Sequence, residues 1–198
     1  MLYLASKSPR RRQLLEQIGI RFDVLDVDVP EIRRIDEPAE DYVSRVAREK
    51  AGAGLLQVAA AAGACVLGAD TEVILDGEVF GKPADAGDAV AMLARLSGRT
   101  HQVLSVVWCV DASREVHAVS VSDVRFDTLS QGRIEDYVAS GEPFGKAGAY
   151  AIQGLAATFV SRLEGSFSGV MGLPLHETWR VLSELRVNHT QAKRAPGP

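Results

Sequence analysis

Hydrophobic positions in the N-terminal part of the chain alternate between strand-like runs and helical stripes. Residues 2–5 form a short apolar run that predicts a strand, and the helical stripe that follows it stops at a glycine. Ser8 suits the N-cap of this helix and Pro9 suits its first position. A second strand is predicted over residues 22–27, and a long helix with one apolar face over about residues 38–57. Strands and helices therefore alternate in this part of the chain.

The middle of the chain is dominated by strand-like patterns. Residues 65–69 form a continuous apolar run, typical of a strand buried on both faces, and we expect this strand to end at Asp70. A hairpin is predicted over residues 72–80, because two strand-like segments flank an Asp-Gly pair. Two long alternating segments, residues 101–110 and 115–126, predict a second hairpin.

The remaining segments predict three helices, one strand and a polar tail. Helices are expected over residues 85–96, 130–140 and 175–185, and a strand over residues 158–163. In the last helix, Leu175, Trp179 and Leu182 are expected on one face.

These elements together predict an α/β fold, with a mixed twisted sheet flanked by helices. We expect a single domain over residues 1–187. Residues 188–198 have no apolar anchors and are expected to form a disordered tail.

Composition and charge narrow the possible functions. The chain has 198 residues, of which 46% are hydrophobic and 24% charged, and this excludes a disordered, collagen-like or disulfide-rich protein. The formal net charge of −4 argues against a nucleic-acid coat and a polybasic membrane binder, so any anion-binding site must be local. The sequence has no recognisable secretion signal or membrane-spanning segment, and we expect a cytoplasmic protein with no membrane partner.

The cysteines and histidines do not suggest a disulfide or zinc framework. Cys65 and Cys109 each lie in an apolar strand-like run, which favours buried, reduced thiols. The four histidines are scattered and do not share zinc-ligand spacing with the cysteines. A structural zinc site is therefore not expected.

A basic cluster lies at the start of the first predicted helix. Three arginines from Arg10 to Arg12 occupy its first turn, where each opposes the helix dipole by about 0.3–1 kcal/mol. A bound polyphosphate would make the net electrostatic interaction of these arginines favourable, and Ser6 and Ser8 could complete its binding site. On this hypothesis, removing Arg11 is neutral or slightly stabilising when no ligand is bound. The alternative is an exposed basic turn that water solvates.

Acidic and basic candidates lie further along the chain. Asp70 and Glu31 follow predicted strands and could hold Mg²⁺ and orient a water, although Asp70 could instead cap a turn. Lys50 points toward the buried side of its predicted helix, and Lys82 precedes a proline that holds its backbone extended. Each lysine alone is better explained by snorkelling or by an ordinary turn. Together these groups suggest a site for a metal-bound triphosphate.

A series of motifs, in order along nearly the whole chain, resembles the Maf family of nucleoside triphosphate pyrophosphatases. They are Leu4-Ala5-Ser6-Lys7-Ser8-Pro9-Arg10-Arg11, Ala47-Arg48-Glu49-Lys50-Ala51, Gly68-Ala69-Asp70-Thr71, Gly81-Lys82-Pro83, Leu96-Ser97-Gly98, Ala147-Gly148-Ala149-Tyr150 and Val170-Met171-Gly172-Leu173-Pro174-Leu175. The resemblance implies a fold similar to inosine triphosphate pyrophosphatases, with two lobes around a central groove. It also implies cleavage of a nucleoside triphosphate to monophosphate and pyrophosphate with a divalent metal, Mg²⁺ or Mn²⁺.

The resemblance also assigns roles to residues around the reacting phosphates. Asp70 is expected to accept the proton of the attacking water, and Glu31 to be its acidic partner, so that both would hold the metal. Arg11, Lys50 and Lys82 are expected to contact phosphates.

The positions implied for base specificity are Arg10, Thr71 and Gln153. The amide of Gln153 can both donate to and accept from a pyrimidine edge, whereas a carboxylate there could only accept. The chain therefore resembles the dTTP/UTP branch of the family. The expected partners are the nucleoside triphosphate and a second copy of the chain in a homodimer.

Two other functions stay open on the sequence alone. The first is a non-catalytic nucleotide- or nucleic-acid-binding regulator of septum formation, against which stand the net charge and the absence of aromatic residues among the arginines. The second is a pyrophosphatase for a damaged purine nucleotide.

Overall fold

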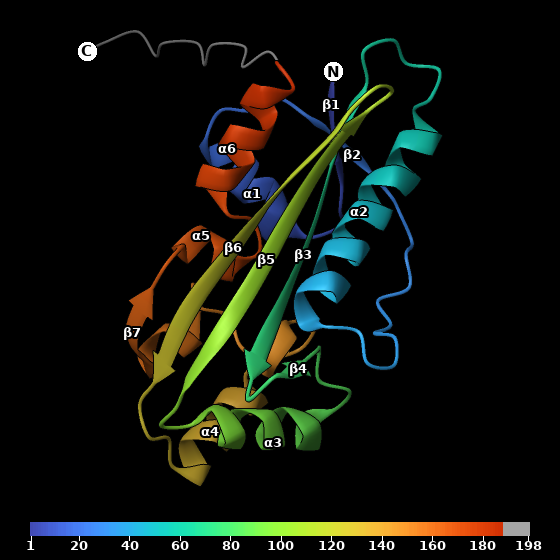
Figure 1. Cartoon of the computed structure of the whole chain (residues 1–198). Coiled ribbons are helices and arrows are strands. Elements are labelled where there is room, and N and C mark those ends of the chain that lie inside the picture. Colours follow the sequence, from blue (N-terminus) through green and yellow to red (C-terminus); the bar gives the residue numbers. More distant parts are fainter. Residues whose placement is uncertain (188–198) are drawn as a thin grey trace, which may run out of the picture.

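A computed structural model describes residues 1–187, and the tail predicted over residues 188–198 lies outside the described residues. The strands form one seven-stranded sheet in the order β2-β1-β3-β5-β6-β7, with β4 paired to β3 (Figure 1). β1 pairs in parallel with β2 and β3, whereas the other strand pairs are antiparallel. The mixed sheet flanked by helices that the sequence predicts is therefore confirmed.

The N-terminal segment forms a strand, a helix and a second strand as predicted. β1 (Leu2–Ala5) leads into α1 (Pro9–Gln17), where the Ser8 hydroxyl caps the helix by accepting a hydrogen bond from the Arg11 backbone N–H. Gly19 ends the helix with a φ of 72°, a conformation that glycine adopts without strain. β2 (Asp23–Leu25) is shorter than the sequence pattern indicates.

β3 (Cys65–Leu75) has an interrupted edge. It pairs with β1 up to Leu67, and with β4 (Glu78–Phe80) only from Val73 onward. On its other side it pairs with β5 over nearly its whole length. Residues 68–72 therefore have a neighbouring strand on one side only.

The prediction that this strand ends at Asp70 is wrong. β3 continues through Asp70, which lies opposite Val106 of β5, as far as Leu75. The ladder with β5 holds the strand in register, and a lysine from the neighbouring helix compensates the buried charge of Asp70. A polar residue at this point therefore marks a functional position within the strand and not its end.

The C-terminal half supplies the long antiparallel strands. β5 (Thr100–Asp111) and β6 (Glu115–Phe126) form the second predicted hairpin, and β7 (Val160–Glu164) pairs with β6. Three short helical segments were not anticipated from the sequence. They are η1 (Ala147–Ala149), η2 (Leu155–Phe159) and α5 (Phe167–Met171).

Helices cover both faces of the sheet. α2 (Ala39–Gln57) packs on β1, β3 and β5, whereas α5 and α6 (Leu175–Glu184) pack against β5 and β6 on the opposite side, where α1 also lies (Figure 1). α3 (Ala86–Leu96) and α4 (Gln131–Ala139) contact each other at the end of the sheet where β3 and β4 turn.

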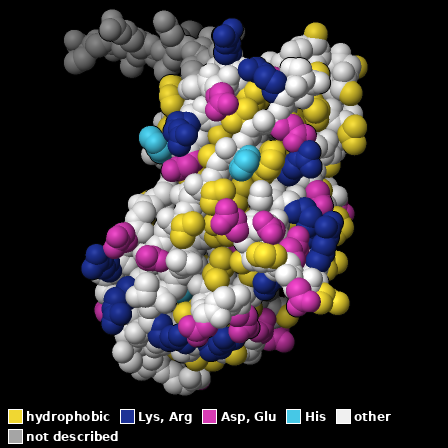
Figure 2. Space-filling model, viewed as in Figure 1, with side chains coloured by type: hydrophobic (Ala, Val, Ile, Leu, Met, Phe, Trp, Pro, Cys, Tyr) yellow, Lys and Arg dark blue, Asp and Glu magenta, His cyan; other side chains and the backbone are white. Residues whose placement is uncertain are grey.

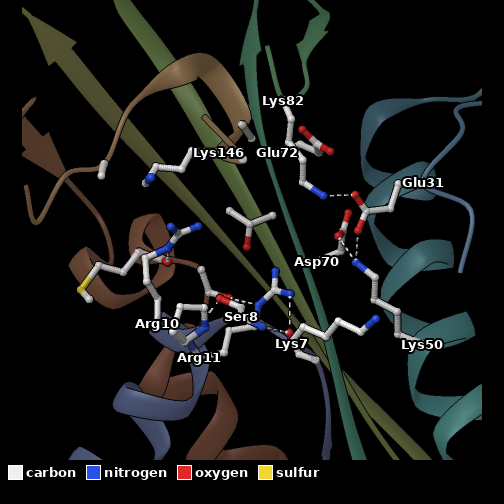
Figure 3. Close-up of a pocket in the computed structure, with 18 of the residues that line it drawn as sticks. Lys7, Ser8, Arg10, Arg11, Glu31, Lys50, Asp70, Glu72, Lys82 and Lys146 are labelled. Carbon is white, nitrogen blue, oxygen red and sulfur yellow. Dashed lines mark hydrogen bonds and ion pairs between the residues drawn. The ribbon is translucent and has the colours of Figure 1, made fainter. Parts of the chain in front are cut away.

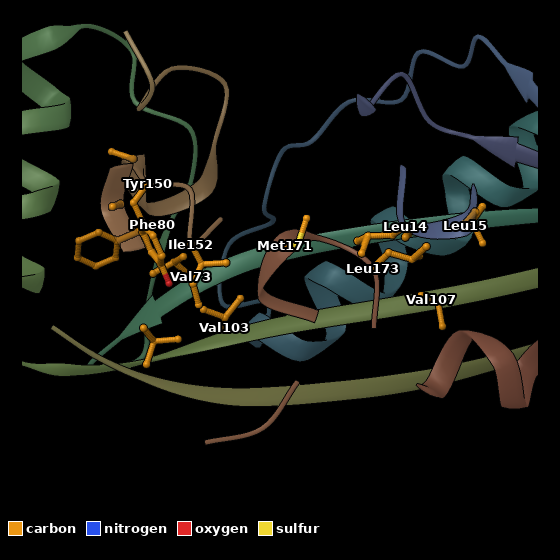
Figure 4. Packing of buried hydrophobic residues seen from close by; sticks show 14 of the residues in the cluster. Leu14, Leu15, Val73, Phe80, Val103, Val107, Tyr150, Ile152, Met171 and Leu173 are labelled. Atoms are coloured by element: carbon orange, nitrogen blue, oxygen red, sulfur yellow. The ribbon is translucent and has the colours of Figure 1, made fainter. Parts of the chain in front are cut away.

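The largest hydrophobic core lies on the α6 side of the sheet. Leu14, Leu15 and Leu173 pack there along β3 and β5, and Phe80 and Tyr150 pack near the β4 end (Figure 4). Trp179 does not join the buried face of α6 as predicted, because it is 44% exposed; Thr178, Val181 and Leu182 occupy that face. The apolar stripe is rotated from the predicted one by about one residue.

Cys65 and Cys109 are buried free thiols, as predicted. Their sulfur atoms lie 2.7 Å apart, because Cys109 faces Leu67 across the β3–β5 ladder and Cys65 is two residues away on the same face.

Gly68 sets the distance between α2 and β3. A Cβ atom at this position would lie 2.3 Å from the Ala47 carbonyl oxygen and 2.6 Å from the Ala51 backbone nitrogen. Backbone atoms cannot yield as the end of a flexible side chain would, so the helix can approach this closely only over a glycine. This close approach positions the side chains of α2 over the gap in the sheet.

Candidate active site

A cavity of about 670 Å³ opens beside the interrupted edge of β3. Its walls come from the β1–α1 junction, the loop after β2, α2, β3, the segment after β4, and the turns around η1 and the end of α5. This volume is in the range of small-molecule sites. All of the site residues expected from the sequence line it: Ser6, Ser8, Arg10, Arg11, Glu31, Lys50, Asp70, Thr71, Lys82 and Gln153.

One wall of the cavity holds a chain of ion pairs. Lys50 of α2 donates to Asp70 Oδ1 and to Glu31 Oε1, each at 2.7 Å, and Lys82 donates to Glu31 Oε2 (Figure 3). Lys50 is 8% exposed and Asp70 is 4% exposed. The prediction that Lys50 points to the buried side of its helix is therefore confirmed.

The ion pairs with Lys50 and Lys82 hold the Glu31 side chain in position. It lies in the loop after β2, and the Tyr42 hydroxyl of α2 also donates to the Glu31 backbone carbonyl at 3.1 Å. Burial by itself would raise the pKa of Glu31, but the nearby Lys50 and Lys82 outweigh it and lower this pKa to about 2. Glu31 is therefore ionised throughout the neutral range.

Glu72 is a further acidic residue of the cavity, which the sequence reasoning missed. It follows Asp70 by two residues on β3 and therefore shares its face of the strand. Burial, with the negative charges of Asp70 and Glu31, raises the pKa of Glu72 to about 8. Strand alternation was the signal that could have revealed it, but ending the strand at Asp70 hid that signal.

Two carboxylate oxygens on this wall have no hydrogen-bond partner in the described chain. They are Asp70 Oδ2 and Glu72 Oε2, and both are buried. Each is an acceptor that a bound ion or water would satisfy.

The opposite wall of the cavity is basic. Arg10 Nε donates to the Met171 carbonyl at 3.2 Å, and Arg11 Nε donates to the Gly172 carbonyl at 2.8 Å. Arg11 also donates from Nη1 to the Ser6 hydroxyl at 3.3 Å. The two guanidinium groups are thus attached at the end of α5, and Figure 3 shows them on the side of the cavity away from Glu31.

These contacts correct the expected effect of removing Arg11. Its side chain is half-buried and bonded to a backbone carbonyl, so its loss leaves the Gly172 oxygen without this donor. Arg12 has an exposed side chain, and for this residue relief of the helix-dipole clash is the dominant effect. The three arginines are therefore not equivalent.

Positive charges crowd together on the basic wall. Burial, and the charge of Arg11, lowers the pKa of Arg10, and burial with the charge of Arg10 lowers the pKa of Lys146. Lys146 also lines the cavity and was not anticipated from the sequence. Unlike the acidic wall, this wall lacks carboxylates in direct contact with its arginines among residues 1–187. A bound anion would relieve the repulsion.

The remaining expected residues lie at the end of the cavity near η1 and α5. Thr71 Oγ1 and Ser105 Oγ lie 2.7 Å apart, and Ser105 donates to the Gly169 carbonyl at 2.7 Å, which fixes the Thr71 side chain. Gln153 is exposed and lines the same cavity. Its amide is free to meet a ligand.

Within residues 1–187, no three His, Cys, Asp or Glu side chains are arranged so as to hold a metal ion by themselves. A metal here would need ligands from a substrate or from water. Searching the same residues for membrane spans finds no helix of sufficient length and hydrophobicity to cross a bilayer.

Comparisons with known proteins found both a similar structure and similar sequences. A structure titled "The structure of the Staphylococcus aureus Ham1 protein" aligns with a TM-score of 0.42 and 16% identity, over 63% of this chain and 71% of that chain. A protein of Xylella fastidiosa (strain 9a5c), named nucleoside triphosphate pyrophosphatase, is 60% identical over 92% of this chain and 97% of its own length.

A protein of Xanthomonas euvesicatoria pv. vesicatoria, named dTTP/UTP pyrophosphatase, is 58% identical over the same shares of the two chains. The model of the Maf-like proteins matches residues 1–185. These matches extend over almost all of the described residues, and the chain therefore belongs to the Maf family.

Proposed function

We propose that the protein is a nucleoside triphosphate pyrophosphatase that hydrolyses dTTP and UTP to the monophosphate and pyrophosphate. One observation carries this proposal: a single cavity places the carboxylates of Asp70 and Glu31 opposite the guanidinium groups of Arg10 and Arg11. Carboxylates suit a water and a metal ion, and guanidinium groups suit phosphate oxygens. A triphosphate bridging the two walls would meet both.

In the proposed reaction, a water attacks one phosphorus of the α–β anhydride and the bridging P–O bond breaks. Asp70 accepts the proton of the water, and Oδ2 is the atom available for it because Oδ1 already accepts from Lys50. Arg11 and Lys82 bind phosphate oxygens and stabilise the negative charge of the leaving pyrophosphate. Lys50 holds the Asp70 carboxylate in place through its ion pair with Oδ1.

A divalent ion fits the acidic wall, because the buried Asp70 Oδ2 has no partner among the described residues, and its two lone pairs allow it to contact both the ion and the attacking water. The family resemblance assigns Glu31 as well as Asp70 to the metal. Both oxygens of Glu31 are occupied by lysines, so Glu31 would reach a metal only by exchanging one of them. When bound, Mg²⁺ or Mn²⁺ would spread the developing phosphate charge and lower the pKa of a bound water.

The pyrimidine preference rests on the residues near the end of the cavity. The Gln153 amide can donate to a carbonyl oxygen and accept from the ring N–H of uracil or thymine. Thr71 and Arg10 lie along the same cavity and complete the proposed base site. The names of the relatives support the same substrate class.

A nucleotide panel tests the proposal. The protein is incubated with Mg²⁺ and, separately, dTTP, UTP, the purine triphosphates and modified purine triphosphates, and the released pyrophosphate and nucleotide products are measured. We expect monophosphate and pyrophosphate from dTTP and UTP. Release of inorganic phosphate with a nucleoside diphosphate would place the cut at another linkage and contradict the proposal. Turnover of a modified purine triphosphate alone would contradict the proposed pyrimidine substrates.

The face of the molecule shown in Figure 2 gives no reason to prefer a nucleic-acid partner. On the face shown in Figure 2, lysine and arginine side chains of the described residues are interspersed with aspartate and glutamate. A continuous basic stripe would be expected for nucleic-acid binding. The homodimer stays part of the proposal, and sedimentation equilibrium tests it.

A further inference from the structure

Besides the exposed Asp28, three carboxylates line the cavity, all on its acidic wall, and they differ in how their oxygens are used. Both oxygens of Glu31 accept from lysines, and one oxygen of Asp70 accepts from Lys50. Neither lysine donates to Glu72, whose Oε2 is buried without a partner, as is Asp70 Oδ2. The unused acceptors of this wall are therefore on Asp70 and Glu72.

Burial makes these unused acceptors costly. Asp70 is 4% exposed and Glu72 is 6% exposed, so water cannot freely solvate either carboxylate. A buried polar atom without a partner is destabilising, and a buried charge without one is more so. A ligand that contacts these oxygens would remove this cost.

The backbone places the two carboxylates for a shared ligand. They alternate on one face of β3, about 6.6–6.8 Å apart along the strand, and both side chains line the cavity (Figure 3). This stretch of β3 has no neighbouring strand on the side of the gap. A ligand can therefore approach both carboxylates from the cavity.

A divalent cation has the chemistry that this pair requires. Mg²⁺ is commonly held by one or two carboxylates, with substrate phosphates and water as its other ligands. Lys50 and Lys82 together balance the charges of Glu31 and Asp70, whereas Glu72 has no ion pair with a described residue. A dication would supply the missing positive charge beside Glu72.

We propose that Glu72 is a protein ligand of the divalent metal, beside Asp70, while Glu31 serves to hold Lys50 and Lys82 in place. This inference rests on the proposed pyrophosphatase function and makes it more specific. It assigns metal binding to a residue that none of the motifs carrying the family resemblance contains.

Direct metal binding tests the inference without relying on turnover. Free Mn²⁺ is measured by electron paramagnetic resonance during titration of the protein, with and without UTP. We expect Glu72→Gln, which keeps the shape of the side chain, to weaken Mn²⁺ binding at least about tenfold. Glu78→Gln is the matched control, because Glu78 is an exposed residue of β4 that pairs with Arg95 and does not line the cavity.

A second variant separates ligation from a general change in charge. In Glu72→Cys a thiolate replaces the carboxylate, so metal preference should shift from Mn²⁺ toward the thiophilic Cd²⁺. The ultraviolet sulfur-to-cadmium charge-transfer band should therefore be stronger than in the native protein, whose own thiols, Cys65 and Cys109, are buried.

The outcomes distinguish this inference from the proposed function. Native-like Mn²⁺ affinity in folded Glu72→Gln, or a Glu72→Cys variant whose cadmium band is no stronger than that of the native protein, would overturn the role of Glu72. The pyrophosphatase proposal would then still stand if the native protein releases pyrophosphate from UTP. Failure of the native protein to release it would instead contradict the function, whatever Glu72 binds.

Discussion

Lys50 Nζ lies 2.7 Å from Asp70 Oδ1, and both side chains are buried between α2 and the interrupted edge of β3. The pair forms because Gly68 allows the helix backbone to come close to the strand just before Asp70. A buried ion pair contributes little net stability, because desolvation offsets the attraction. The ion pair instead fixes the position of the Asp70 carboxylate: Oδ1 is bound by Lys50, and Oδ2 has no partner in the described chain.

The first prediction concerns Asp70. Asp70→Asn should lower kcat for pyrophosphate release from UTP by at least about 10²-fold, because an amide cannot accept the proton of the attacking water. The fold should survive, since the amide oxygen can still accept from Lys50, which also keeps its bond to Glu31. Asp123→Asn, an exposed position on β6, should leave kcat unchanged. Near-normal turnover in folded Asp70→Asn would assign the base to another residue.

The second prediction compares neighbouring arginines of α1. Arg11→Ala should lower the free energy of unfolding by about 1–3 kcal/mol, because the Gly172 carbonyl loses a charged donor. It should also reduce the rise in melting temperature that UTP produces, since the stabilisation by a ligand falls with its affinity.

Arg12→Ala is the control for this pair, because Arg12 lies on the exposed side of the same helical turn. It should be neutral or slightly stabilising and should keep the full UTP shift. Thermal denaturation with and without UTP measures both effects. An unchanged UTP shift in Arg11→Ala would make this arginine purely structural.

The third prediction concerns Gly68. In Gly68→Ala the new methyl group would overlap the Ala47 carbonyl and the Ala51 nitrogen, and the forced separation of α2 from β3 should cost about 1–3 kcal/mol. Turnover should fall by about tenfold or more, because Lys50 moves with the helix.

Gly52→Ala provides a matched control for this effect. Gly52 is in the same helix, but a Cβ atom there meets nothing within 4 Å, so the change should stabilise the helix by about 0.5–1 kcal/mol. Urea denaturation and steady-state kinetics measure both variants. Native stability and activity in Gly68→Ala would show that the close approach is not required.

The fourth prediction concerns the pH dependence of stability in the presence of a chelator. The folded-state pKa of Glu72 is about 8, above the unfolded value of about 4.3, so the folded state keeps a proton that the unfolded state releases. The corresponding stabilisation is complete below the unfolded pKa and is lost as pH rises through about 8.

Glu72→Gln carries no titrating group at this position and should lose this part of the pH dependence. The native protein should therefore lose more unfolding free energy than Glu72→Gln between about pH 5 and pH 9, a range that starts just above the unfolded pKa and extends past the folded one. Glu78→Gln should follow the native curve across most of this range, because Glu78 is exposed and its pKa is lowered by Arg95. Parallel curves for native protein and Glu72→Gln would contradict the raised pKa.

Much of the fold was predictable because its signals are local. Ser8 and Pro9 define the start of α1, and an Asp-Gly turn defines the β3–β4 hairpin. Apolar periodicity predicted α2 and the long β5–β6 hairpin. The ordered motifs predicted which residues would line one cavity, although they are far apart in the chain.

Other features were decided by contacts between segments distant in sequence. Whether β3 ends at Asp70 depends on its hydrogen-bonded ladder with β5. Which carboxylate oxygens are paired depends on which lysine side chain reaches them. Glu72 shows the difference best: its residue type and its place two positions after Asp70 are in the sequence, but its burial and its unpaired oxygen follow from packing.

The sequence by itself thus determined the order of the main helices and strands, because capping, turn and periodicity signals act over a few residues. Its ordered motifs determined the family and the ten expected residues that line the cavity. Only the tertiary structure decided that a gap opens between β1 and β4, that Arg11 is bonded to the Gly172 carbonyl, and that Asp70 and Glu72 are left with free oxygens. These outcomes depend on distances between segments, and hydrogen bonds and charges respond to those distances within a few ångströms.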